Sequence, residues 1–187
     1  MDCLYYIFER KILWVPILVL GSAAAFKLRL RITCGHCKSN RRMDEKVVIV
    51  TGANTGIGRE TAANLAQRGA RVILACRTMK KAQQVAKHII KQSHNKHVCP
   101  MKLDLCSFQS IRKFVQDFKK KEDKLDVLIN NAGVFGPHER VITEDGLETT
   151  FQTNHFGPFL LTLLLLPTLK STTPSRIINV SSQVILE

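Results

Sequence analysis

The chain has 187 residues, of which 45% are hydrophobic and 23% are charged. This composition is typical of a globular protein with one substantial core, and it excludes a disordered chain and a small disulfide-stabilised scaffold. The net charge is +13, but the basic residues are spread along the chain and no helix face or arginine-rich arm collects them. Since a nucleic-acid-binding protein should cluster its positive charge, we expect no nucleic-acid partner.

The N-terminal region contains an uncharged stretch, Ile12 to Phe26, between Lys11 and Lys27. As a helix this stretch would span about 22 Å, short of the ~30 Å hydrocarbon core of a bilayer, although snorkelling lysines and the apolar residues that follow would extend it. More basic residues follow the stretch than precede it, which favours retention of the C-terminal side in the cytosol. We therefore predict a membrane anchor and its basic flank over residues 1–32, with residues 12–26 in the membrane.

Two further points about this segment stay open. Its length also suits the core of a cleaved signal peptide, with Ala23-Ala24-Ala25 imitating a cleavage site. We expect the membrane to be that of the endoplasmic reticulum, with the folded domain in the cytosol, and a mitochondrial membrane is the alternative.

Residues 33–45 are mostly polar and are interpreted as a linker into the folded domain. They contain Cys34-Gly35-His36-Cys37, a lone CxxC motif. A zinc site would need a second pair of ligands at a suitable spacing, and none is evident, so we expect two free thiols and no metal. The six cysteines of the chain are scattered, which favours a reducing compartment.

From Lys46 onward, short β-branched runs alternate with segments of helical periodicity. Such alternation with short loops predicts βαβ units, right-handed crossovers and a doubly wound, Rossmann-like parallel sheet of the α/β class. Ser107 is a candidate cap for the third of the helices. The strands are expected at 46–50, 71–76, 98–103, 125–130 and 176–180, and the helices at 59–68, 78–93, 108–121 and 143–169, the last with a loop or bend near Gly157-Pro158.

The turn after the first strand carries the strongest chemical signal. Three glycines lie between a buried strand and a helix, where a dinucleotide site requires them, because glycine permits a tight turn and a close approach of the backbone to a pyrophosphate. The helix that begins near Ile57 offers free N–H groups and its positive dipole end to the same phosphate. We assign six residues of the turn to cofactor binding: Gly52, Asn54, Thr55, Gly56, Ile57 and Gly58.

The end of the second strand indicates which dinucleotide is bound. An NAD site places a carboxylate there, which accepts a hydrogen bond from the ribose 2′-OH. This chain has Ala75-Cys76-Arg77 instead, and a guanidinium can pair with the 2′-phosphate of NADP as a planar donor. We therefore expect NADP(H), the alternative being that Arg77 is merely a solvated side chain at a strand end.

Five motifs in order give the chain a clear resemblance to the short-chain dehydrogenase/reductase family. Thr51 to Gly58, TGANTGIG, is similar to the cofactor-binding motif TGxxxGxG of that family. The resemblance covers about residues 46–182. The four further matches are Leu103-Asp104-Leu105 after the third strand, Asn130-Asn131-Ala132-Gly133 after the fourth, Asn154 in the helix that follows, and Asn179-Val180-Ser181-Ser182 on the fifth strand.

The resemblance implies hydride transfer between the nicotinamide ring and an alcohol or carbonyl. It implies that Asp104 meets the adenine ring and that Asn131, Ala132 and Gly133 belong to the cofactor site. It further implies that Asn154 holds a water in a proton path and that Ser182 donates a hydrogen bond to the substrate oxygen.

The family's catalytic Tyr-x-x-x-Lys pair has no counterpart among these residues. It lies C-terminal to the serine, whereas the only tyrosines of this chain are Tyr5 and Tyr6. We therefore expect residues 46–187 to form an NADP-binding domain that is incomplete after the fifth strand and inactive alone. That strand should be an exposed edge, and the apolar run 156–169 should be a partly uncovered core helix rather than a second membrane span. The alternative is a short product that binds NADP(H) or a partner without catalysis.

Within the family, the anchor, the basic linker and three short segments are similar to membrane-associated retinol dehydrogenases. The segments are Val50 to Gly58, VTGANTGIG, Leu74 to Arg77, LACR, and Ser175 to Ser182, SRIINVSS. This similarity implies a lipophilic alcohol or aldehyde, such as retinol or retinaldehyde, as the substrate. The oligomeric state is not indicated.

Overall fold

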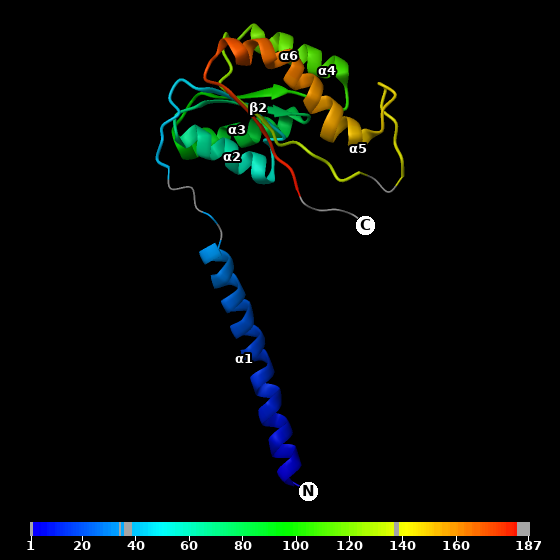
Figure 1. Cartoon of the computed structure of the whole chain (residues 1–187). Helices are drawn as coiled ribbons and strands as arrows, with labels where there is room; N and C mark the ends of the chain where they lie inside the picture. Colours follow the sequence, from blue (N-terminus) through cyan, green and yellow to red (C-terminus); the bar gives the residue numbers. More distant parts are fainter. Residues whose placement is uncertain (1, 34, 36–38, 137–138, 183–187) are drawn as a thin grey trace. The chain divides into compact units, whose positions relative to one another are not determined.

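The structure, a computed structural model, describes residues 2–33, 35, 39–136 and 139–182, and it divides into two compact units, Met1–Asn40 and Arg41–Glu187 (Figure 1). The first unit contains the helix α1, Asp2–Thr33. Across the described residues we find no helix that is both long enough and apolar enough to cross a bilayer. The membrane anchor thus stays a prediction. Cys34 and Cys37 lie outside the described residues, and the described part holds no cluster of three candidate metal ligands.

The second unit is built on one parallel sheet of five strands, in the order β3-β2-β1-β4-β5. This order has its reversal of winding between β1 and β4, and it confirms the predicted doubly wound α/β fold. The first two strands are almost wholly buried, as continuous β-branched runs should be. The strands are β1 (Val47–Thr51), β2 (Arg71–Cys76), β3 (Val98–Lys102), β4 (Val127–Asn130) and β5 (Arg176–Asn179).

Helices cover both faces of the sheet. The helices α2 (Gly56–Gln67) and α3 (Met79–Ser93) lie on one face, and α4 (Phe108–Lys119) and α6 (Gly157–Ser171) lie on the other (Figure 1). Successive residues of β1 point to opposite faces, so Val48 belongs to the core under α2 and Ile49 to the core under α4. Ser107 caps α4 as expected, because its hydroxyl accepts the Ser110 N–H at 3.2 Å.

The prediction of one helix over residues 143–169 is wrong at its start. Residues 143–148 form a turn closed by a bridge between Ile142 and Glu148. The helix begins only at α5 (Thr149–Phe151), because the Glu148 carboxylate accepts the N–H groups of Thr150 and Phe151, both at 2.8 Å. These bonds lower the pKa of Glu148.

The expected bend near Gly157-Pro158 is also displaced. The irregular segment is η1, the π-helical turn Gln152–Phe156, and α6 then begins directly at Gly157. Gly157 is packed against the loop after β3, since a Cβ on it would lie 2.5 Å from the carbonyl oxygen of Leu105. The glycine therefore serves close packing, and the π turn directly precedes this contact.

The expected edge strand is confirmed at β5. All four of its residues are exposed, with Ile177 and Ile178 exposed by 40% and 43%. The helix α6 packs Leu161, Leu165 and Leu169 into the core while several of its other apolar side chains stay exposed. It is therefore a core helix with an uncovered side, as its place between two strands of the sheet predicted.

The expectation that no helix face collects basic residues is wrong for α3. This helix buries Ala82, Ala86 and Ile89, and the lysines at positions 80, 87 and 91 fall on its opposite, exposed side. Counting charges along the chain missed this stripe, because the helical period of 3.6 residues gathers side chains that are seven and four positions apart.

A buried carboxylate joins β1 to the segment that leads into β4. One oxygen of Asp126 accepts the backbone N–H of Val47 at 2.9 Å, and the other accepts Lys46 Nζ at 2.8 Å. Lys46 is substantially exposed, so the backbone bond should contribute most of the stability.

We expect the Asp126→Ala substitution to lower the free energy of unfolding by about 2 kcal/mol, because the Val47 N–H would be buried without an acceptor. The Asp126→Asn substitution keeps an acceptor oxygen and should cost less than half of that. Urea unfolding of the three proteins measures both differences. Equal losses for the alanine and asparagine variants would contradict the role assigned to the backbone bond.

Candidate functional site

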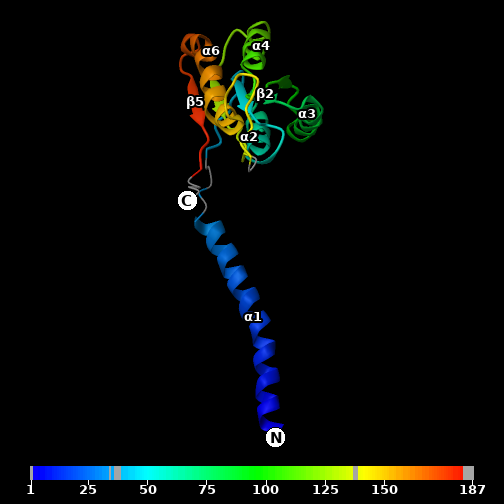
Figure 2. The same cartoon turned by 90° about the vertical axis from the view of Figure 1, so that its right-hand side faces the viewer.

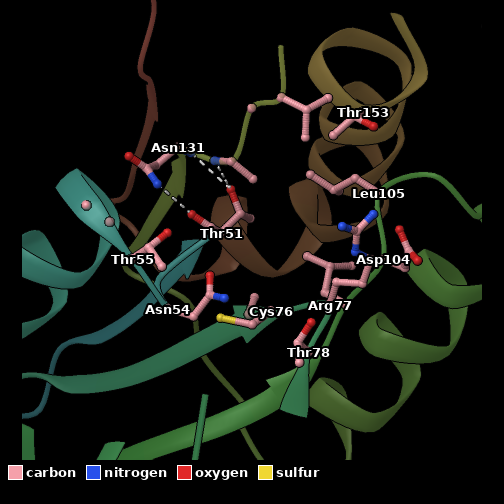
Figure 3. A pocket seen from close by; sticks show the side chains of 18 of the residues that line it. Thr51, Asn54, Thr55, Cys76, Arg77, Thr78, Asp104, Leu105, Asn131 and Thr153 are labelled. Atoms are coloured by element: carbon pink, nitrogen blue, oxygen red, sulfur yellow. Dashed lines mark hydrogen bonds between the residues drawn. The ribbon is translucent and has the colours of Figure 1, made fainter. Parts of the chain in front are cut away.

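A crevice of about 490 Å³ opens at the carboxyl ends of β1, β2 and β4 (Figure 3). This is the reversal point of the strand order, where ligands of doubly wound sheets bind. All eleven residues that the sequence assigned to a cofactor line this one crevice: Gly52, Asn54, Thr55, Gly56, Ile57, Gly58, Arg77, Asp104, Asn131, Ala132 and Gly133.

Two glycines of the first turn have left-handed backbone angles. Gly52 has φ +66°, and a Cβ on it would lie 2.9 Å from the Cα of Ala132. Gly56 has φ +52°, but a Cβ there would meet nothing within 4 Å. Gly52 therefore permits the turn and the approach of the loop after β4, whereas Gly56 permits the turn and leaves the space in front of it open.

The third glycine is required by close packing alone. A Cβ on Gly58 would lie 2.5 Å from Nδ2 of Asn131 and 2.6 Å from the carbonyl oxygen of Gly52. The helix α2 thus begins directly against the loop after β4. No side chain caps its first turn, and that turn contains no acidic residue. Its free N–H groups and positive dipole end are therefore available to an anion in the crevice.

Thr51 joins the two loops that form the floor of the crevice, a role that the sequence reasoning did not assign to it. Its hydroxyl oxygen accepts the backbone N–H groups of Asn131 at 3.0 Å and Ala132 at 2.9 Å. The Asn131 side chain donates in return to the Thr51 carbonyl at 2.9 Å, as Figure 3 shows. Thr51 is only 1% exposed. Its position as the first residue of the glycine motif was the available signal.

Arg77 lies at the opposite side of the crevice from Asn131, near Asp104 and Thr78 (Figure 3). Its side chain is exposed, and within the described parts of the chain it has no carboxylate within ion-pair distance. Thr78 is the N-cap residue of α3 but its side chain makes no capping bond, and the first turn of α3 has no acidic residue. A guanidinium and an open helix N-terminus therefore lie side by side.

Asp104 is held by the turn that leads into α4. Its Oδ1 accepts the Cys106 N–H at 3.0 Å, and its own backbone N–H donates to Ser110 Oγ at 3.0 Å. These bonds fix the loop that follows β3, and this loop forms one side of the crevice. Besides Thr51, the sequence reasoning did not assign eight lining residues to the site: Ala75, Cys76, Thr78, Leu103, Leu105, Cys106, Val134 and Thr153.

The thiol of Cys76 lies beneath the glycine turn. Cys76 is 2% exposed, and burial raises its pKa to about 11, although the backbone N–H groups of Ala53 and Asn54 act in the other direction. The thiol is therefore protonated at physiological pH, and the side chain packs as a small apolar group.

We expect Cys76 to resist alkylation while the chain is folded. Relative to a thiol with the ordinary pKa of 9.0, it should form about a hundredfold less thiolate at pH 8, and its burial adds a steric barrier. Iodoacetamide labelling followed by peptide mass spectrometry should show modification of the half-buried Cys99 and Cys106 well before Cys76. Equal labelling rates in the folded chain would contradict this packing.

The two residues predicted to act in catalysis do not line the crevice. Asn154 lies in η1, where its Nδ2 donates to the Val134 carbonyl at 2.9 Å and its Oδ1 accepts the Val134 N–H at 2.8 Å. Asn154 thus fixes the backbone at Val134, the residue that follows the loop 131–133. Ser182 is exposed and follows β5 by three residues. Their catalytic roles stay predictions.

Comparison with known proteins agrees with this geometry. The model of the short chain dehydrogenase family matches residues 46–186. The chain therefore belongs to the short-chain dehydrogenase family. It is 50% identical to human retinol dehydrogenase 13 over 171 residues, which is 90% of this chain and 51% of that protein. It is 52% identical to human retinol dehydrogenase 11 over 160 residues, which is 85% of this chain and 50% of that protein.

Solved structures with the same fold include nicotinamide complexes. A putative short-chain dehydrogenase from Shigella flexneri complexed with NADP is 30% identical, with a TM-score of 0.66 over 77% of this chain and 62% of that one. A second, from Escherichia coli and complexed with NADPH, has the same identity and TM-score over 77% of this chain and 61% of that one. This chain spans about half the length of the curated relatives it matches.

Proposed function

We propose that this protein is an NADP(H)-dependent oxidoreductase that acts on a lipophilic alcohol or aldehyde, such as retinol or retinaldehyde. The family and the two named relatives support the substrate class. The observation that carries the cofactor assignment is Arg77 beside the open N-terminus of α3, at the rim of the crevice. A carboxylate at the end of β2 would favour NAD, and the sequence there is Ala75-Cys76-Arg77.

The residues of the crevice fit such a cofactor. The open N-terminus of α2 and the space before Gly56 suit the pyrophosphate. Arg77 and the first N–H groups of α3 suit the 2′-phosphate, and Asp104 suits the adenine side. The loop at 131–134 then bounds the nicotinamide side. A bound cofactor would supply the hydride, and Ser182 and Asn154 are proposed to orient the substrate oxygen and a water.

A second candidate function concerns this 187-residue polypeptide by itself. Its tyrosines are Tyr5 and Tyr6, and residues 46–187 contain none. We propose that it binds NADP(H) without reducing retinal. We also propose that residues 12–26 attach it to a membrane, with the endoplasmic reticulum preferred over a mitochondrial membrane.

Fluorescence titration of the full chain with NADPH tests the proposal. We expect saturable enhancement of nicotinamide fluorescence and much weaker binding of NADH. Under the second candidate function, this polypeptide should show no turnover when retinal is added. A cooperatively melting chain that leaves millimolar NADPH unbound would overturn the cofactor assignment. Retinal reduction that copurifies with the chain would instead overturn the non-catalytic alternative.

A further inference from the structure

The charge of the second unit is unevenly distributed along its sequence. Residues 61–103 contain nine Lys or Arg and three His but no Asp or Glu. The same stretch contains no Phe, Tyr or Trp. It begins within α2 and ends just after β3, so the β2–α3–β3 part of the fold is built entirely without carboxylates.

The helix α3 gathers part of this charge on one face. Lys80, Lys87 and Lys91 project within about 40° of one another and over about 16 Å along the axis, at 100° and 1.5 Å per residue. The opposite side of the helix is buried at Ala82, Ala86 and Ile89. Figure 2 shows α3 on the outer flank of its domain, at the other end from β5. These three lysines are called the basic face of α3.

In the described part of the chain, no ion pair compensates the charge on this face. Lys87 and Lys91 are an i, i+4 pair of like charge, which destabilises a helix. Lys80 lies in the first turn, at the positive end of the helix dipole. Among the described residues, no carboxylate oxygen lies within 4 Å of any of the three ammonium groups. By contrast, Asp117 pairs with both Lys113 and Lys120 on α4. The basic face of α3 is thus unfavourable for the isolated fold, and a negatively charged surface would relieve it.

We propose that the basic face of α3 docks on an anionic lipid surface. Lysine ammonium groups are point charges that suit diffuse headgroup charge, whereas nucleic-acid recognition favours arginine forks and aromatic stacking. The chain also carries the apolar segment 12–26, for which a membrane location is predicted from the sequence. The docking goes beyond the oxidoreductase function and does not depend on it.

The test measures how much anionic lipid increases vesicle binding by the full chain. Binding to neutral phosphatidylcholine vesicles reports the apolar segment, and the additional affinity for vesicles with 30% phosphatidylserine reports the charge. The test variant is Lys87→Gln/Lys91→Gln, which leaves Lys80 near the crevice intact. The control is Lys113→Gln/Lys119→Gln, which removes the same charge from α4 on the other face of the sheet.

The anionic increment is the ratio of the affinity for vesicles with phosphatidylserine to the affinity for neutral vesicles. Each lysine near an anionic surface contributes about a fivefold factor to this ratio, so the ratio should be roughly thirtyfold smaller for the α3 variant than for the unmodified chain. For the α4 control the anionic increment should fall by less than threefold. Binding to neutral vesicles should be equal in all three proteins. Equal thermal unfolding midpoints, followed by circular dichroism, show that each variant is folded, and they do so whether or not the chain binds NADPH.

Three outcomes would overturn the docking surface. The α3 variant could keep the full anionic increment, or the two variants could lose it equally. Alternatively, a 20-base-pair DNA duplex could bind more tightly than the anionic vesicles and depend on Lys87 and Lys91, which would make the face a nucleic-acid surface. Failure to bind neutral vesicles would count against the apolar segment alone.

Discussion

Replacement of Gly58 with alanine is expected to abolish NADPH binding and to lower the free energy of unfolding by about 3 kcal/mol. The added Cβ would meet Nδ2 of Asn131 at 2.5 Å and the carbonyl oxygen of Gly52 at 2.6 Å. Neither group can move freely, because the first donates to Thr51 and the second is backbone. The start of α2 would therefore shift away from the loop after β4, and the crevice would lose its floor.

Gly56→Ala is the matched control for this experiment. The new Cβ would meet nothing within 4 Å, although the φ of +52° would be strained. We expect a stability loss of about 1 kcal/mol, close to the usual cost of a left-handed alanine. NADPH binding should still weaken, because the Cβ would occupy space before the turn. Thermal unfolding and NADPH fluorescence separate the two effects, and equal stability losses in the two variants would contradict the packing assigned to Gly58.

Arg77→Gln should weaken NADPH binding about a hundredfold and leave NADH binding nearly unchanged. Two charge-assisted hydrogen bonds to a 2′-phosphate together contribute about 3 kcal/mol, which corresponds to that factor. NADH lacks this phosphate, so its affinity reports only the rest of the crevice. Fluorescence titration with both cofactors measures the change in preference.

Arg112→Gln is the control for Arg77→Gln, since it removes the same exposed guanidinium from α4, away from the crevice. It should alter NADPH affinity less than threefold. If both substitutions weaken NADPH binding equally, the effect is one of net charge. If Arg77→Gln weakens NADPH and NADH alike, the side chain does not read the 2′-phosphate, and the NADP(H) assignment fails.

The sequence alone was sufficient to predict the α/β class, every strand, the glycine turn and eleven of the residues that line the crevice. Strand and helix periods are local properties, and right-handed crossovers leave few ways to order such strands. The ends of the helix before β5 were less accessible to sequence reasoning. Its start depends on the Glu148 cap, and its π turn accompanies the contact between Gly157 and Leu105, which are 52 positions apart.

Only the tertiary structure decided how the motifs work together. Thr51 and Asn131 are 80 positions apart and still exchange hydrogen bonds. The three glycines of one motif have three different roles, since Gly52 permits the turn and a close approach, Gly56 permits the turn, and Gly58 permits close packing. The basic face of α3 likewise emerged only when the helix was placed with its alanines against the sheet. The physical reason is the same in each case: a sequence pattern specifies which groups a segment presents, whereas packing between distant segments determines what those groups meet.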